Sequence, residues 1–146
     1  MIWILDYMFY RTYLAYKKAN EPAMFSSILY LSILLLFVFL PAIFFICDIM
    51  YNGSDVFYKI CFFVNVTFII IAVSVRYMRK GMMRELTDDF SNCKWNNVIP
   101  IWAFWTLVFI FMIVGVTVHI LIARNITYPY GLRGIGYKFL VNLFGN

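Results

Sequence analysis

Charged side chains are absent from three long stretches of the sequence, and these stretches predict its main elements. They contain 26, 16 and 29 residues and lie between Glu21 and Asp48, between Lys59 and Arg76, and between Lys94 and Arg124. A helix that crosses a bilayer needs about 20 predominantly apolar residues, because the hydrocarbon layer is about 30 Å thick. The middle stretch reaches this length when Lys59 extends its long side chain toward water. We therefore predict transmembrane helices over residues 26–47, 57–75 and 99–122.

The first predicted span contains a proline in its interior. Pro41 cannot donate the backbone hydrogen bond that a helix would direct to Phe37, and its ring crowds the preceding turn. We therefore expect a kink between Phe37 and Pro41. A membrane helix tolerates such a proline when a neighbouring helix satisfies the carbonyl that is left free.

Residues 1–20 are interrupted by charges and cannot cross a bilayer. Their tyrosines recur at every third position, which places them on one broad side of a helix, and they are Tyr7, Tyr10, Tyr13 and Tyr16. A tyrosine combines an apolar ring with a polar tip, which suits the headgroup layer of a membrane. We predict an interfacial amphipathic helix, whose tyrosine side serves either as a membrane anchor or as a docking face for a partner.

The composition favours a membrane protein and excludes two other classes. Of the 146 residues, 64% are hydrophobic and 13% are charged. A soluble domain carries about 25% charged residues to cover its surface. Intrinsic disorder requires low hydrophobicity, which this sequence lacks. We predict a single all-α membrane domain, residues 1–146, in which three transmembrane helices follow the interfacial helix.

The basic residues are unevenly distributed around the predicted spans. Eight precede the first span or lie in the loop of residues 76–98, and four lie on the other side. The more basic side of a membrane protein faces the cytoplasm. We therefore expect a cytoplasmic N-terminus and loop, an external tail over residues 123–146, and a place in the cell inner membrane. This topology explains the net charge of +5, so no nucleic-acid partner is expected.

Residues capable of catalysis or metal binding are few and isolated. His119 is the only histidine, and no acidic residue lies inside the predicted spans to pair with it. Proton relays and metal sites need such partners. We expect no catalytic residue, no metal and no cofactor, and therefore no enzyme activity. For His119 we expect a hydrogen-bonded place near the membrane surface.

The three cysteines follow neither a metal-binding nor a C-x-x-C spacing. Cys47 and Cys61 lie at similar depth, near the ends of the first two predicted spans. Buried thiols without reactivity are the default for such residues. The alternative is a disulfide across the first loop, which requires an oxidising environment on that side of the membrane.

Small and polar residues inside the second and third spans are candidates for contacts between helices. They are Asn65, Thr67, Gly115 and Thr117. Such residues let helix backbones approach closely and hydrogen-bond across membrane helices. They serve either packing within the chain or the binding of a partner. Together with the four tyrosines they are the candidate partner-binding residues.

The opening of the sequence carries one resemblance. The motifs are DYMFYR at Asp6–Arg11 and KKANEPAMF at Lys17–Phe25, directly before a long apolar span. In this region the chain resembles small Tyr-rich polytopic inner-membrane proteins of Bacteroidetes genomes. No function comes with the resemblance. Immunity partners of membrane-acting toxins are also small polytopic proteins, which is an analogy of architecture alone.

These features predict a non-enzymatic membrane protein that acts by helix–helix binding. Its partners are the lipid bilayer and another membrane protein or a second copy of the chain. The most specific form of this prediction is immunity against a membrane-targeting toxin. The alternatives are a small accessory subunit of a larger membrane complex and a pore-forming or holin-like protein.

Overall fold

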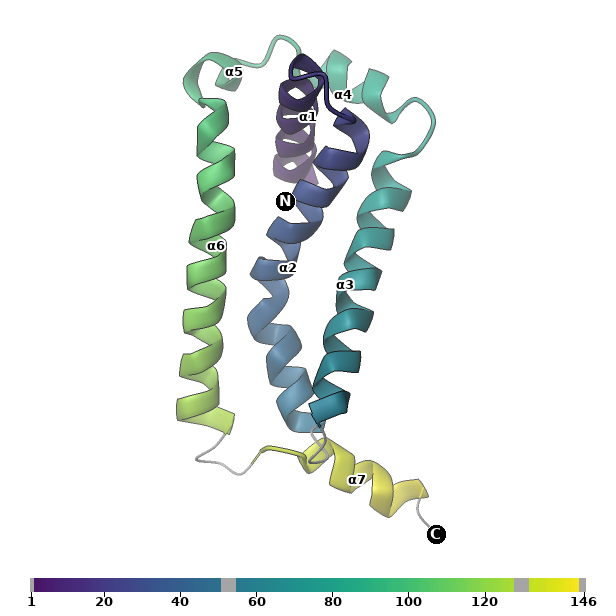
Figure 1. Cartoon of the computed structure of the whole chain (residues 1–146), viewed down its shortest axis with the longest axis vertical. Coiled ribbons are helices and arrows are strands. Elements are labelled where there is room, and N and C mark those ends of the chain that lie inside the picture. Colours follow the sequence, from purple (N-terminus) through teal and green to yellow (C-terminus); the bar gives the residue numbers. More distant parts are fainter. Residues whose placement is uncertain (1, 51–54, 128–131, 145–146) are drawn as a thin grey trace. The chain divides into compact units, whose positions relative to one another are not determined.

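The computed structural model describes residues 2–50, 55–127 and 132–144, and these residues are predominantly helical, with no strand among them (Figure 1). The helices are α1 (Ile2–Lys18), α2 (Ala23–Met50), α3 (Asp55–Tyr77), α4 (Met82–Phe90), α5 (Trp95–Val98), α6 (Ile101–Ile122), a π-helical turn (Ala123–Thr127) and α7 (Ile135–Phe144). The expected all-α class is confirmed, with an N-terminal helix that precedes three long apolar helices. Parts of the first loop and of the tail, residues 51–54, 128–131 and 145–146, lie outside the described residues.

Three helices are long and apolar enough to cross a membrane, and they are the three that the charge spacing predicts. The candidate spans are Ala23–Met50, Val56–Tyr77 and Ile101–Ile126. The helix of the third span begins at Ile101, two residues after the predicted start of the span at residue 99. Ile99 has an extended backbone, with φ −96° and ψ 110°, because the residue before a proline is pushed out of the helical region. The helix therefore begins after Pro100.

α1 ends in a regular C-terminal cap. Asn20 adopts a left-handed conformation with φ 58°. The amide of Glu21 then donates to the carbonyl of Tyr16 at 3.1 Å, and the amide of Asn20 donates to Lys17 at 3.2 Å. This pair of bonds is the Schellman arrangement, which satisfies carbonyls at the end of a helix. Pro22 follows, and α2 begins at the next residue.

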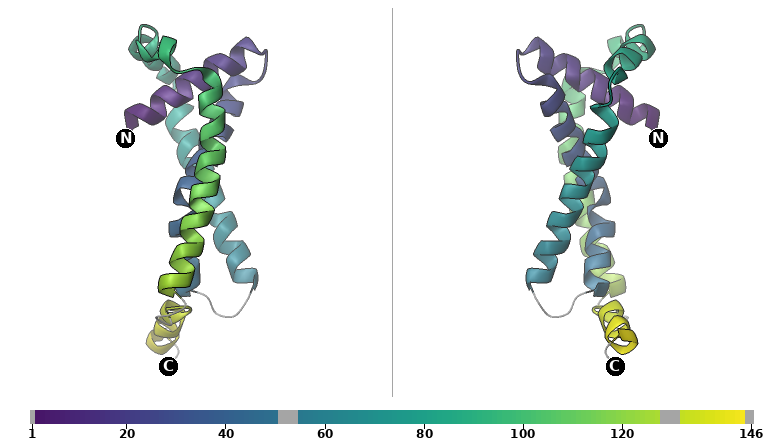
Figure 2. Two further views of the ribbon diagram at one scale, coloured as in Figure 1. Left: turned by 90° about the vertical axis from the view of Figure 1, so that its left-hand side faces the viewer. Right: turned by 90° about the vertical axis from the view of Figure 1, so that its right-hand side faces the viewer.

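The chain divides into two compact units, and we describe each separately. The first unit comprises residues 1–35 and 68–110. Within it, α1 packs against α4, and the two helices lie side by side in the turned views (Figure 2). Helix α4 presents one apolar stripe at four-residue spacing, formed by Met82, Leu86 and Phe90, and all three side chains are buried.

α1 is buried deeply within the first unit. Its four consecutive residues Tyr7–Tyr10 are all buried, although they point to different sides of a helix. The ring of Phe9 stacks on Tyr77 of α3 with centroids 3.9 Å apart. The hydroxyl of Tyr30 on α2 donates to the carbonyl of Phe104 on α6 at 2.6 Å. The N-terminal helix is therefore part of a packed core and not only a surface helix.

The second unit comprises residues 36–67 and 111–146. Here α2 continues through Pro41 without an interruption of the helix. The ring of Phe44 on α2 lies beside Phe62 of α3 and His119 of α6, with centroid distances of 6.4 and 4.7 Å. The amide of Gly134, just before α7, donates to the carbonyl of Asp48 at 2.8 Å. α2 thus contacts both other long helices in this unit.

Candidate partner-binding surfaces

An acidic residue near the start of α1 connects this helix to α3 in the first unit. The guanidinium of Arg76 grips the carboxylate of Asp6, with Nη2 at 2.7 Å from Oδ2 and 2.9 Å from Oδ1. The hydroxyl of Tyr77 donates to Asp6 Oδ1 at 2.7 Å. Asp6 is mostly buried, whereas Arg76 is partly exposed. A charged, bidentate contact of this kind fixes orientation as well as distance.

A basic residue one and a half turns further along α1 binds the chain just before α6. Arg11 donates from Nη1 to the carbonyl of Asn96 at 2.8 Å and from Nη2 to the carbonyl of Ile99 at 3.0 Å. These carbonyls belong to the end of the short helix α5, where no intrahelical donor is available. The side-chain amide of Asn96 in turn donates to the carbonyl of Phe90 at 2.7 Å. Arg11 therefore ties α1 to the ends of both α4 and α5.

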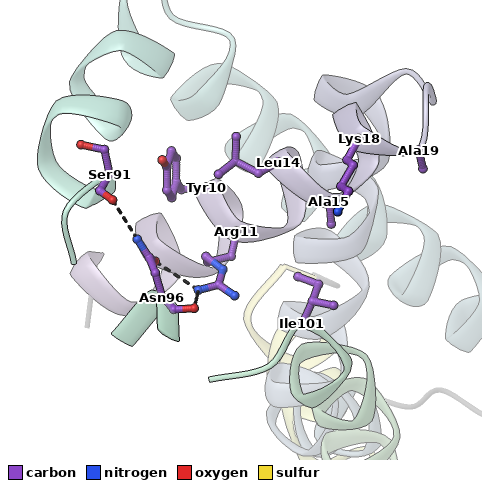
Figure 3. Close-up of a pocket in the computed structure, with 9 residues that line it drawn as sticks. All are labelled: Tyr10, Arg11, Leu14, Ala15, Lys18, Ala19, Ser91, Asn96 and Ile101. Atoms are coloured by element: carbon purple, nitrogen blue, oxygen red, sulfur yellow. Dashed lines mark hydrogen bonds between the residues drawn. The ribbon is translucent and has the colours of Figure 1, made fainter. Parts of the chain in front are cut away.

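A pocket of about 570 Å³ lies beside this arginine (Figure 3). Figure 3 shows the guanidinium of Arg11 directed toward Asn96, which lies between it and Ser91. The other lining residues are mainly apolar and small, namely Tyr10, Leu14, Ala15, Ala19 and Ile101, with Lys18 at the rim. Because the two nitrogens at the tip of Arg11 already bond to Asn96 and Ile99, this arginine acts within the fold.

The predicted tyrosine side of α1 is largely covered by the protein itself. Tyr7 and Tyr10 are each only 4% exposed. Both rings pack against Phe90 of α4, with centroids 5.5 and 6.0 Å away. Tyr16 meets Trp105 of α6 edge-on at 5.3 Å, and Tyr13 is half-buried. These side chains therefore build contacts within the first unit.

Burial raises the pKa of two tyrosines of α1, Tyr7 and Tyr16. Burial raises the pKa of Tyr7, and the neighbouring Arg11 offsets part of that rise by favouring the phenolate. Burial also raises the pKa of Tyr16, and the nearby carboxylate of Glu21 adds to the effect. Neither phenol is activated as a base, which agrees with a packing role.

The polar residues predicted on α3 have different surroundings. The side-chain amide of Asn65 donates to the carbonyl of Cys61, one turn earlier in the same helix, at 2.8 Å. Thr67 is exposed. Within the second unit the exposed positions of α3 follow a three- and four-residue spacing, typical of one helix face. These positions are Val56, Lys59, Ile60, Phe63, Val64 and Thr67.

Gly115 of α6 lies directly against the proline turn of α2 in the second unit. A Cβ atom at this glycine would lie 2.5 Å from the carbonyl oxygen of Phe37. This is the carbonyl that Pro41 leaves without its helical donor, so the glycine allows the α6 backbone to cover it. Weak Cα–H···O contacts form at such close helix approaches. Gly115 therefore serves a contact within the chain.

Thr117 lies on a different side of α6 from Gly115 and is exposed. Exposed apolar neighbours accompany it at helical spacing in the second unit, and these are Ile113, Ile120 and Leu121. In the first unit the exposed residues of α6 are Trp102, Thr106, Phe109 and Ile110. The hydroxyl of Thr106 donates a hydrogen bond to the carbonyl of Ala103 in the same helix, at 2.9 Å.

Ionisable residues in the second unit do not assemble into a metal site. No group of three or more metal-ligating side chains occurs among the described residues. His119 rests against Phe44, and its Nδ1 is buried without a hydrogen-bond partner among the residues described. The expected hydrogen bond of His119 is therefore not formed at this nitrogen. Asp48 instead accepts a hydrogen bond from the hydroxyl of Tyr58.

The contacts of Asp6 and Arg11 were not anticipated as parts of a site. Arg11 bonds to a residue 85 positions away, and Asp6 pairs with one 70 positions away. The available signal was the rarity of charge within an apolar N-terminal segment, which marks residues that need a partner. In comparisons with known proteins, no protein-family model, no curated protein and no solved structure matched this chain.

Proposed function

We propose that this chain is a non-enzymatic, multi-pass protein of the cell inner membrane that acts by binding the transmembrane helices of another membrane protein. The observation that carries this proposal is the uncovered surface of α3 and α6. Only 6% of the residues in the α3 span and 11% of those in the α6 span are buried within the chain, compared with 39% in the α2 span. α2 supplies the internal packing, so the other two helices are left free to contact lipid and a partner.

The exposed faces of α3 and α6 are apolar with few polar groups. They suit a partner helix of similar composition. Each face combines large apolar side chains with a single hydroxyl in the second unit, at Thr67 and at Thr117. Hydroxyls on such faces hydrogen-bond across helices in a membrane. Gly115, Tyr7, Tyr10 and Tyr16 make their contacts inside the chain.

The same surfaces argue against a pore as the main function. A water-filled channel needs polar or charged side chains along the helix face that lines it. The exposed face of α3 in the second unit has one charged residue, Lys59, in its first turns. Beyond Lys59 its exposed residues are Ile60, Phe63, Val64 and Thr67, of which only Thr67 is polar. Binding as an accessory subunit uses the same contacts as the main proposal, and only the identity of the partner separates the two.

In this proposal the N-terminus and the segment that contains α4 and α5 face the cytoplasm, and the C-terminus lies outside. The excess of lysine and arginine on the first side supports this orientation. α1 then lies at the cytoplasmic membrane surface, where Lys17 and Lys18, both exposed, face anionic lipid.

Co-purification in mild detergent tests the binding proposal. We expect a defined partner to accompany the wild-type chain in stoichiometric amount. Replacing Ile113 by Trp, which enlarges the exposed face of α6, should reduce the recovered partner at least several-fold. The matched control is Leu121→Met, which keeps the volume of an exposed residue. Recovery of the wild-type chain alone from its native membrane would contradict the proposal.

The more specific form of the proposal is immunity against a membrane-targeting toxin. Cells that express the chain alone should survive a challenge with the cognate toxin, and cells that express Ile113→Trp should not. Unchanged killing by toxin, together with a stable partner in detergent, would contradict immunity and leave the accessory-subunit form. Growth arrest and dye leakage on expression of the chain would favour the pore-forming alternative.

A further inference from the structure

Two cysteines of the second unit lie between two contacts that join α2 to α3. On one side of them, the hydroxyl of Tyr58 donates to the carboxylate of Asp48. On the other side, the rings of Phe44 and Phe62 lie nearly parallel, with centroids 6.4 Å apart. Cys47 precedes Asp48, and Cys61 precedes Phe62. The two thiols are therefore placed opposite each other along a pair of antiparallel helices.

The side chains of Cys47 and Cys61 also lie near each other. The thiol of Cys61 is near enough to act on the thiol of Cys47, and both are free thiols in this structure. A disulfide requires sulfur atoms about 2.0 Å apart and Cβ atoms about 3.5 to 4.5 Å apart. Because neighbouring contacts on both sides already hold the helices together, closing the sulfur–sulfur distance requires side-chain rotation and little backbone movement.

We propose that Cys47 and Cys61 are a redox-active pair that forms a disulfide between α2 and α3. The oxidant is a small-molecule or protein disulfide. Cys47 is 2% exposed, whereas Cys61 is half-buried and is the sulfur that an oxidant reaches first. Cys61 is thus the attacking thiol, and Cys47 is the resolving thiol.

The reaction is two successive thiol–disulfide exchanges. The thiolate of Cys61 attacks one sulfur of the oxidant, forms a mixed disulfide and releases the first oxidant thiolate. The thiolate of Cys47 then attacks the sulfur of Cys61, forms the Cys47–Cys61 bond and releases the second thiolate. The two cysteines lose two electrons, the oxidant gains them, and the two protons leave on the released thiols.

The bond would close the chain segment that joins α2 to α3. Cross-linking two residues in this way stabilises a fold mainly by restricting its unfolded state. Under the orientation proposed above, this end of the helices faces the outside of the cell, where disulfides persist. The ability to form the bond depends on the packing of the second unit and not on that orientation, so the two proposals can fail separately.

The test uses the reduced full-length chain in detergent, with dithiodipyridine as the oxidising disulfide. After oxidation, the chain is denatured and labelled with a maleimide–polyethylene glycol. The chain has three cysteines, so the reduced protein takes three labels. The oxidation is measured in Cys93→Ser, because dithiodipyridine would also leave a pyridine adduct on Cys93. After oxidation we expect this variant to take no label, to have a mass lower by two hydrogen atoms before labelling, and to show a thermal midpoint raised by several degrees.

Matched variants identify the pair. Cys93→Ser should still lose both of its remaining labels on oxidation. Cys47→Ser should retain a pyridine adduct on Cys61, because no thiol remains nearby to displace it. Stable adducts on both Cys47 and Cys61 in the wild-type chain would overturn the proposal, and so would a bond to Cys93 or a cross-linked dimer.

Discussion

At the scale of single residues, two charged side chains of α1 fix the position of this helix in the first unit through ion-pair and hydrogen-bond contacts. Asp6 binds Arg76 and Tyr77, and Arg11 binds the carbonyls of Asn96 and Ile99. Buried polar groups are costly when they lack partners, so each of these contacts excludes other positions of the helix. Charge in this protein therefore specifies where an otherwise apolar helix packs.

Replacing Arg11 by Lys should loosen the N-terminal helix even though the charge is kept. A lysine has one ammonium group and cannot span the carbonyls of Asn96 and Ile99 with separate nitrogens. We expect a loss of about 1.5 to 3 kcal/mol, the usual range for a hydrogen bond to a charged group. Thermal unfolding in detergent measures it. The control is Lys17→Gln at an exposed lysine of the same helix. Equal stability of Arg11→Lys and Lys17→Gln would show that the hydrogen bonds of Arg11 do not stabilise the fold.

Replacing Gly115 by Ala should destabilise the second unit. The added Cβ would lie 2.5 Å from the carbonyl oxygen of Phe37, so the backbone of α2 or α6 has to move. Overpacking of this kind costs about 1 to 3 kcal/mol. Thermal unfolding of Gly115→Ala, compared with Thr117→Ala on the exposed side of the same helix, provides the measurement. A midpoint equal to that of the control would show that the close approach is unimportant.

At the scale of elements, α4 packs on α1 and buries part of its surface. Its apolar stripe of Met82, Leu86 and Phe90 faces inward, and its charged residues remain exposed. Nine residues form too short a helix to be stable alone in water, so α4 depends on this packing. The two helices should therefore lose their order together.

An aspartate at Leu86 should separate α4 from α1. Leu86 is 2% exposed, so the variant places an unpaired charge in a buried position. We expect backbone amides of both helices to exchange hydrogen several-fold faster. The same charge introduced at the exposed neighbour Thr87 should leave exchange unchanged. Faster exchange in α4 alone would contradict the coupling of the two helices.

The elements differ in how far sequence alone predicts them. The three long helices follow from the absence of charge over a bilayer thickness, a constraint that acts locally along the chain. The proline turn at Pro41 and the close approach of Gly115 were each visible as residue types, but their pairing was not. The burial of Tyr7 and Tyr10 depends on Phe90, which is distant in sequence, so periodicity alone could not separate a membrane-facing side from a packed one.

At the scale of the whole molecule, the distribution of residues along the chain and the low burial of two spans support a membrane protein with a binding role. The three candidate spans account for most of the hydrophobic residues, and the basic residues gather before the first span and between the second and third. In the candidate spans of α3 and α6, only 6% and 11% of the residues are buried within the chain. Lipid can cover such a surface, and a helical partner can replace part of that lipid.

The proposed orientation places the two ends of the chain on opposite sides of the membrane. In a variant that lacks the three native cysteines, Lys138→Cys should react with a membrane-impermeant maleimide in intact cells. Lys17→Cys should react only after the cells are permeabilised. Both positions are exposed, so burial does not protect either of them. Labelling of Lys17→Cys in intact cells would contradict the orientation.

Site-specific photo-crosslinking in the native membrane tests the binding proposal most directly. The photoreactive residue replaces Phe63 on α3 or Ile113 on α6, which are 67% and 62% exposed, with the fully buried Leu31 as the control. The proposal predicts a discrete protein adduct of the same partner from at least one of the exposed positions, and none from position 31. Adducts with lipid alone at both exposed positions would contradict it.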